Sequence, residues 1–179
     1  MSVTAIVILA LLALAQPVLR GWGRHALLGA SVQTVALGLA AILAAAADPV
    51  AGFWRNAALV VAVAAVALSA DPVVRAAFTL ARRSTAATEP PADHAPDDDD
   101  GQPGPLRGGL AIGILERSAI AAAVLTHWPE GIAVVLAVKG LARYPELRRA
   151  DASEQFIIGT FTSVLWALAI CGVATLLIT

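Results

Sequence analysis

Long apolar runs alternate with short polar breaks along the chain, and their lengths predict membrane-crossing helices. A helix needs about 20 residues to cross the hydrocarbon layer, and roughly 17 suffice. The six candidate runs are residues 3–19, 26–47, 53–70, 109–125, 132–142 and 156–178. We expect the short fifth run to gain length by continuing through Tyr144, and the alternative is a re-entrant half-helix. The pattern predicts an all-α fold: a polytopic membrane helical bundle of about six transmembrane helices.

Short local motifs refine the boundaries of the first three helices. Asp48-Pro49 follows the second run, and Asp71-Pro72 follows the third, which continues as an amphipathic tail to Arg83. Proline disfavours the helical conformation in the residue before it and has no N–H to donate. Ala13-Leu14-Ala15 is similar to a signal-peptide cleavage site, but no lysine or arginine precedes Arg20. We therefore expect an uncleaved first helix.

Residues 84–108 interrupt the apolar pattern. They hold five of the ten prolines and the acidic run 97–100. A segment of this composition buries too little apolar area to offset its ordering entropy, so we predict a disordered linker. The chain then divides into a three-span N-terminal half (1–83), the linker (84–108) and a three-span C-terminal half (109–179).

The composition excludes several classes of protein. Hydrophobic residues make up 59% of the chain and charged residues 14%, and the mean hydropathy is +0.79. A soluble domain usually carries about 25% charged residues, and a chain of 179 residues cannot bury such an apolar excess. The balance of 12 basic and 13 acidic residues argues against an electrostatic nucleic-acid binder. The single cysteine, Cys171, excludes a disulfide framework.

The distribution of arginine predicts the orientation in the membrane, because short cytoplasmic loops carry an excess of Lys and Arg. With the N-terminus outside, the outer loops hold only Arg55. The inner loops then hold Arg20, Arg24, Arg75, Arg82, Arg83, Arg107, Arg143, Arg148 and Arg149. The aromatic residues at predicted span ends are Trp22, Trp54, Trp128 and Tyr144, as an interfacial belt requires. We expect a multi-pass protein of the cell inner (plasma) membrane with both termini outside and the linker in the cytoplasm.

Charged side chains in the C-terminal half lie at membrane depth and predict a polar cluster. Glu116 lies about 12 Å along its helix from the linker, and Lys139 reaches a similar depth from the next inner loop. A lone charge there costs several kcal/mol, so it needs a partner or water. We expect antiparallel helices to join Glu116 and Lys139 as an ion pair, with Arg143 as a second donor nearer the cytoplasm. The alternative is that Lys139 snorkels to the headgroups, as we expect Arg117 to do.

This cluster could lock the fold, relay protons or ions, or bind an anionic lipid headgroup. Basic pockets on the cytoplasmic side attract anionic lipids. The candidates for lipid-headgroup or inner-surface contacts are Arg117, Arg148, Arg149 and Glu154.

Small residues at steps of four predict close helix packing. They are Gly109 and Gly113 in the fourth run, and Gly159, Ser163, Ala167 and Cys171 in the last. The stripe in the last run predicts either packing within the monomer or a dimer seam. Gln33, in the second run, predicts an interhelical hydrogen bond.

The sequence predicts no metal, no cofactor and no catalytic residue. His127 and Glu130 have i, i+3 spacing, but two ligands make an incomplete metal site, and Pro129 between them predicts a tight turn. The chain lacks the G-x-S-x-G, H-E-x-x-H and Walker motifs of hydrolases, proteases and nucleotide-driven pumps.

Three motifs in the C-terminal half resemble those of a family of bacterial integral-membrane proteins that carries I-G-x-L-E-R, A-x-K-S-x-x-R-x-x-E and E-Y-F-x-I-G-T. The matching residues here are 112–117, Ala137-Val138-Lys139-Gly140 with Arg143 and Glu146, and 154–160. Gly140 replaces the serine and Gln155 the tyrosine, so no role of those hydroxyls is carried over. The resemblance implies a shared membrane architecture, without an activity, and directs attention to Glu116, Lys139, Arg143 and Glu154.

Three functions fit these observations. The leading interpretation is a non-enzymatic membrane component that binds membrane lipids or a membrane protein partner, a second copy of the chain included. The second is a small transporter or ion-conducting protein in which Glu116 and Lys139 line a polar path. The third is a membrane enzyme that acts on a lipid-linked substrate with Glu116 as base.

Overall fold

The protein is an all-α helical bundle, as its sequence predicts. The computed structural model describes residues 1–16, 26–88, 108–148 and 150–179, and these contain helices and no strand. The helices are α1 (Ser2–Leu14), α3 (Ala26–Ala45), α4 (Gly52–Leu68), α5 (Asp71–Thr88), α6 (Gly108–Leu125), α7 (Glu130–Ala142), the short 3₁₀ helix η2 (Glu146–Arg148) and α8 (Ala150–Ile178).

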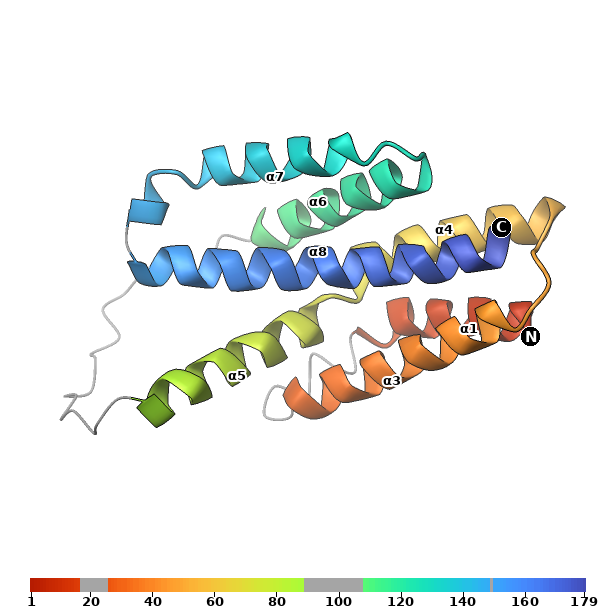
Figure 1. Ribbon diagram of the computed structural model, residues 1–179, viewed down its shortest axis with the longest axis horizontal. Coiled ribbons are helices and arrows are strands. Elements are labelled where there is room, and N and C mark those ends of the chain that lie inside the picture. Colours follow the sequence, from red (N-terminus) through yellow and green to blue (C-terminus); the bar gives the residue numbers. More distant parts are fainter. Residues whose placement is uncertain (17–25, 89–107, 149) are drawn as a thin grey trace.

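Helix α8 is the central element of the bundle. It packs against α3, α4, α5 and α6, while α1 packs against α3 and α4, and α7 packs against α6. Figure 1 shows both termini at one end of the bundle, with the end of α5 and the start of α6 near the other end. We call the latter the linker end. Towards it, α5 diverges from α8 (Figure 1).

Alanines make up much of the interior, and many large apolar side chains face outward. The fully buried alanines include Ala40, Ala58, Ala62, Ala65, Ala121, Ala167 and Ala174. Val35, Ile42, Val60 and Leu165 are more than half exposed. A water-soluble bundle shows the opposite distribution, whereas helices in lipid approach closely through small residues. The exposed apolar surface is therefore suited to lipid.

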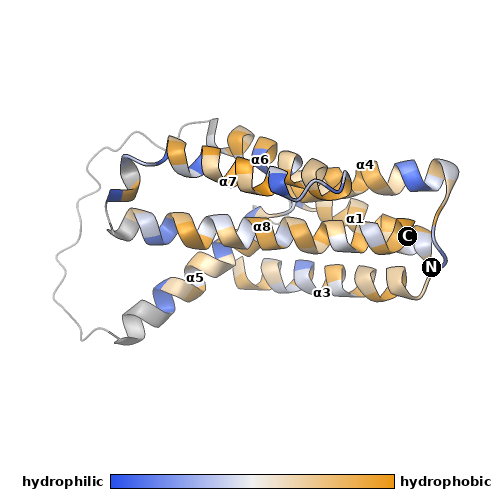
Figure 2. Ribbon diagram, turned by 45° about the horizontal axis from the view of Figure 1, so that its top comes forward, coloured by the Kyte–Doolittle hydropathy of each residue, from blue (hydrophilic) through white to orange (hydrophobic). Residues whose placement is uncertain are grey.

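Three helical segments are long and apolar enough to cross a membrane: Ala26–Ala45, Gly52–Arg83 and Ala152–Ile178. Figure 2 shows hydrophobic residues along most of α3, α4 and α8. Their length and composition are consistent with a location in a membrane. Helices α1 and α7 have 13 residues each, which gives them a length of about 20 Å, so they are shorter than the hydrocarbon layer.

The predicted extension of the fifth helix through Tyr144 is wrong. Helix α7 begins earlier than expected, at Glu130, and ends at Ala142. Tyr144 lies in a turn before Pro145, and proline disfavours the helical conformation in the residue that precedes it. The helix instead runs back along α6 towards the linker end (Figure 1).

The first part of the predicted linker is helical. Helix α5 continues to Thr88, because its sequence contains no proline between Pro72 and Pro90. Helix α6 begins at Gly108. The rest of the predicted disordered linker, residues 89–107, lies outside the described residues.

Candidate functional site

A break between α4 and α5 creates the first part of the site. Helix α4 ends at Leu68 and α5 begins at Asp71, as the Asp71-Pro72 pair predicts. Pro72 has no N–H, so the usual i to i−4 hydrogen bond to the Leu68 carbonyl cannot form. Carbonyl groups in the last turn of α4 therefore need donors from elsewhere in the molecule.

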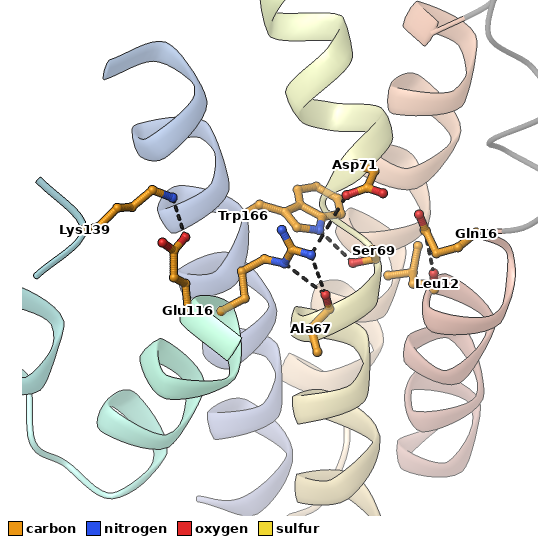
Figure 3. Close-up of polar contacts among 9 residues, drawn as sticks. Leu12, Gln16, Ala67, Ser69, Asp71, Glu116, Lys139 and Trp166 are labelled. Atoms are coloured by element: carbon orange, nitrogen blue, oxygen red, sulfur yellow. Dashed lines mark hydrogen bonds and ion pairs between the residues drawn. The ribbon is translucent and has the colours of Figure 1, made fainter. Parts of the chain in front are cut away.

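Arg117 of α6 supplies one of these donors. Its Nε and Nη2 donate to the carbonyl oxygen of Ala67 at 3.0 and 2.7 Å, and its Nη2 lies 3.9 Å from Oδ1 of Asp71 (Figure 3). The residue is only 8% exposed. The prediction that Arg117 snorkels to the headgroups is wrong, because the broken helix offers its guanidinium a carbonyl and a carboxylate inside the bundle.

Trp166 of α8 also binds at the break between α4 and α5. Its indole Nε1 donates to the hydroxyl oxygen of Ser69 at 2.8 Å, and both residues are buried (Figure 3). This contact was not predicted from the sequence. The available signal was a tryptophan in the middle of an apolar run, since a buried indole N–H usually finds an acceptor.

The predicted ion pair between Glu116 and Lys139 is present. The Lys139 Nζ donates to Oε2 of Glu116 (Figure 3), and the two side chains are 25% and 19% exposed, respectively. Helices α6 and α7 pack against each other in opposite directions. This arrangement brings the two charges to one level, as the sequence predicts.

A cavity of about 590 Å³ joins these polar groups. It lies between α5, α6, α7 and α8, and we call it the basic cavity. Among the described residues, six charged side chains line it: Asp71, Arg75, Glu116, Arg117, Lys139 and Arg143. Four of these are basic and two are acidic, so this described lining is more basic than acidic. The polar side chains of Gln155, Thr160 and Ser163 lie on its α8 wall.

Several residues predicted to pack helices line this cavity instead. A Cβ added at Gly109 would have nothing within 4 Å, so the packing predicted there is wrong. A Cβ at Gly113 would meet only the Arg117 side chain, with Nη1 at 3.2 Å. Gly159 does allow a close approach, because Cζ of Phe78 would lie 3.1 Å from its Cβ. These three glycines and Ser163 all face the basic cavity.

The C-terminal half of the stripe of small residues on α8 is a packing face within the monomer. Ala167 and Cys171 are fully buried in the core. Gln33 is also buried, at 1% exposure, but neither of its amide atoms has a hydrogen-bond partner. The interhelical hydrogen bond predicted for Gln33 is therefore wrong.

The remaining predicted residues lie apart from the cavity or outside the described part of the chain. Arg148 and Glu154 are exposed at the linker end, and Arg149 is not described. The predicted tight turn at His127 is confirmed by its positive φ of 59°. In the described residues, no group of three His, Cys, Asp or Glu side chains could hold a metal ion.

No protein-family model, curated protein or solved structure matches this chain.

Proposed function

We propose that this protein binds an anionic phospholipid, with the phosphate headgroup in the basic cavity. The observation that carries the proposal is the predominance of basic over acidic side chains in the described lining of a cavity of about 590 Å³, in a bundle with three segments long and apolar enough to cross a membrane. Basic pockets between transmembrane helices bind phospholipid headgroups in this way. The proposal extends to topology: six crossings of the plasma membrane with both termini outside, in which the short helices α1 and α7 cross where the bilayer is locally thinned.

The charge pairs within the cavity explain why an anion is the favoured ligand. Both acidic residues already face a basic partner: Glu116 binds Lys139, and Asp71 faces Arg117. The exposed Arg75 has no carboxylate within ion-pair distance among the described residues. A phosphate group would compensate this excess charge, since a guanidinium binds phosphate oxygens through parallel hydrogen bonds.

The packing of the helices explains why the ligand would be a lipid. Helices α5 and α6 both pack along α8 but, in the described part of the chain, make at most slight contact with each other. Direct packing of α5 on α6 therefore does not close the cavity between them. Leu110, on the cavity wall, is 48% exposed. A headgroup could enter from the bilayer while its acyl chains stay in contact with such apolar side chains.

A retention experiment tests the proposal. We expect an Arg75→Ala, Arg143→Ala double variant to bind anionic phospholipid about 30-fold more weakly than the wild type. Each basic residue near a membrane surface contributes about 1 kcal/mol to the binding of anionic lipid, and about 2 kcal/mol corresponds to that factor. Native mass spectrometry after purification in detergent would measure the bound lipid at several lipid concentrations.

Arg55→Ala is the matched control for this experiment. Arg55 is exposed in the first turn of α4, away from the linker end, so its loss removes one positive charge without touching the cavity. Equal lipid binding by the double variant and the wild type would contradict the proposal. A stable Glu116→Gln variant that retains lipid but loses a proton-coupled flux in liposomes would favour transport instead.

Reporter fusions test the proposed topology. We expect a fusion after Thr88 to report the cytoplasm and one after Thr179 to report the exterior, because arginines are retained on the cytoplasmic side. Trp54, in the first turn of α4, and Trp128, between α6 and α7, are exposed, as residues of an interfacial belt would be. A fusion at Thr88 that reports the exterior would contradict this orientation.

A further inference from the structure

A second hollow adjoins the basic cavity and is lined by residues of α3, α5 and α8. Its volume is about 610 Å³, and the charged side chains in its described lining are those of Arg75, Arg82 and Arg83. Ala26 of α3 and Gln155 of α8 complete the walls. We call this hollow the arginine groove. It carries three positive charges and, in its described lining, no compensating carboxylate.

The two hollows share one wall. Arg75, Phe78 and Gln155 line both of them. Arg82 lies seven residues after Arg75, which is two helical turns along the same face of α5 and about 10 Å along the helix axis. Arg75 therefore lies where the two hollows meet, and the guanidinium groups of Arg82 and Arg83 lie nearer the C-terminal end of α5.

We propose that one lipid with two separate phosphate groups occupies both hollows, with one phosphate in the basic cavity and the other in the arginine groove. This inference rests on the proposed function and names its ligand class: a diphosphatidylglycerol-type lipid, in which a polyol bridges the two phosphates. Arg75 would contact both halves of the headgroup. A pyrophosphate group is too short for this spacing, because its two phosphorus atoms share one oxygen.

The surroundings of the two hollows suit a ligand with acyl chains on both sides. Leu80 follows Thr79 of the groove and is 55% exposed, and Leu28, two residues after Ala26, is 56% exposed. Leu110 on the wall of the basic cavity is also exposed. Apolar surface therefore borders each hollow, where the two diacylglycerol groups of such a lipid would lie.

Lipid titrations of the full chain in detergent micelles test this inference with three probes. They are diphosphatidylglycerol, with two phosphates; phosphatidylglycerol, with one; and phosphatidate, whose single phosphate can carry more than one charge. We expect the wild type to bind diphosphatidylglycerol at least about tenfold more tightly than either of the others, since about 1 kcal/mol comes from each further arginine.

Two sets of variants separate the hollows. The Arg82→Ala, Arg83→Ala double variant should bind diphosphatidylglycerol only as tightly as it binds phosphatidylglycerol. Its affinity for phosphatidylglycerol should equal that of the wild type. Arg75→Ala should weaken the binding of both lipids, and Arg55→Ala should weaken neither. Arg82 and Arg83 are exposed, so these substitutions leave the core of the bundle intact, which size-exclusion chromatography would verify.

The failures of the two proposals are distinguishable. Equal affinity of the wild type for all three lipids, or equal affinity for diphosphatidylglycerol and phosphatidate, would overturn the two-phosphate inference and leave the proposed function in place. The inference would also fall if inorganic pyrophosphate displaced diphosphatidylglycerol at equal concentration. The proposed function itself would be overturned if neither the wild type nor the Arg75→Ala variant bound any anionic lipid.

Discussion

We expect Arg117→Ala to lower the melting temperature of the purified protein by roughly 6–12 °C. The substitution removes two charge-assisted hydrogen bonds to the Ala67 carbonyl and leaves Asp71 facing an apolar side chain. Loss of a buried charged partner costs about 3 kcal/mol, and each kcal/mol shifts the melting temperature of a chain of this size by about 2–4 °C. Thermal unfolding followed by size-exclusion chromatography measures the shift.

Arg117→Lys is the control for this first prediction. Lysine keeps the charge but offers a single nitrogen in place of the two that bind the Ala67 carbonyl. We expect it to recover about half of the lost stability. A shift of less than about 2 °C for Arg117→Ala would show that the guanidinium stabilises little, as a snorkelling side chain would.

Glu116→Ala is expected to destabilise the protein by about 2 kcal/mol, and a second change, Lys139→Ala, is expected to restore at least half of this loss. The single variant leaves an ammonium group partly buried without its carboxylate. Removing one partner of a fully buried pair costs about 3–5 kcal/mol. Because these side chains are 19–25% exposed, we expect a smaller cost.

A double-mutant cycle measures the coupling between Glu116 and Lys139 directly. We expect a coupling energy of at least about 1 kcal/mol, whereas Glu116→Ala combined with Arg55→Ala should be additive within about 0.5 kcal/mol. Denaturation of the four variants in mixed micelles supplies the free energies. Additive effects of Glu116→Ala and Lys139→Ala would mean that the pair contributes nothing to stability.

Local chemistry accounts for the parts of the structure that the sequence predicts well. The Asp71-Pro72 pair ends a helix wherever the chain folds, because the missing N–H is a property of the residue itself. The same local effect at Tyr144-Pro145 was overlooked, and the fifth helix is shorter than expected for that reason. The pairing of Glu116 with Lys139 was also predictable, since two opposite charges at one depth on neighbouring antiparallel helices bind each other rather than remain alone in lipid.

Contacts between distant residues could not be predicted in the same way. The partner of Arg117 is a carbonyl oxygen 50 residues earlier in the chain, which is available only because α4 ends beside α6. Which carbonyl accepts from Arg117 depends on how α4 and α6 meet. Every residue has a backbone carbonyl, so the sequence does not indicate which one is the acceptor. For the same reason the bond between Trp166 and Ser69 was missed.

Helix length, proline and hydropathy act through neighbouring residues, so the helices, their apolar character and the charges at one depth follow from the chain alone. The roles of Gly109, Gly113 and Gly159 depend instead on the element opposite each of them, which no local pattern specifies. Gly159 lies against Phe78 of α5, whereas Gly109 has open space beside it, and all three glycines border the basic cavity.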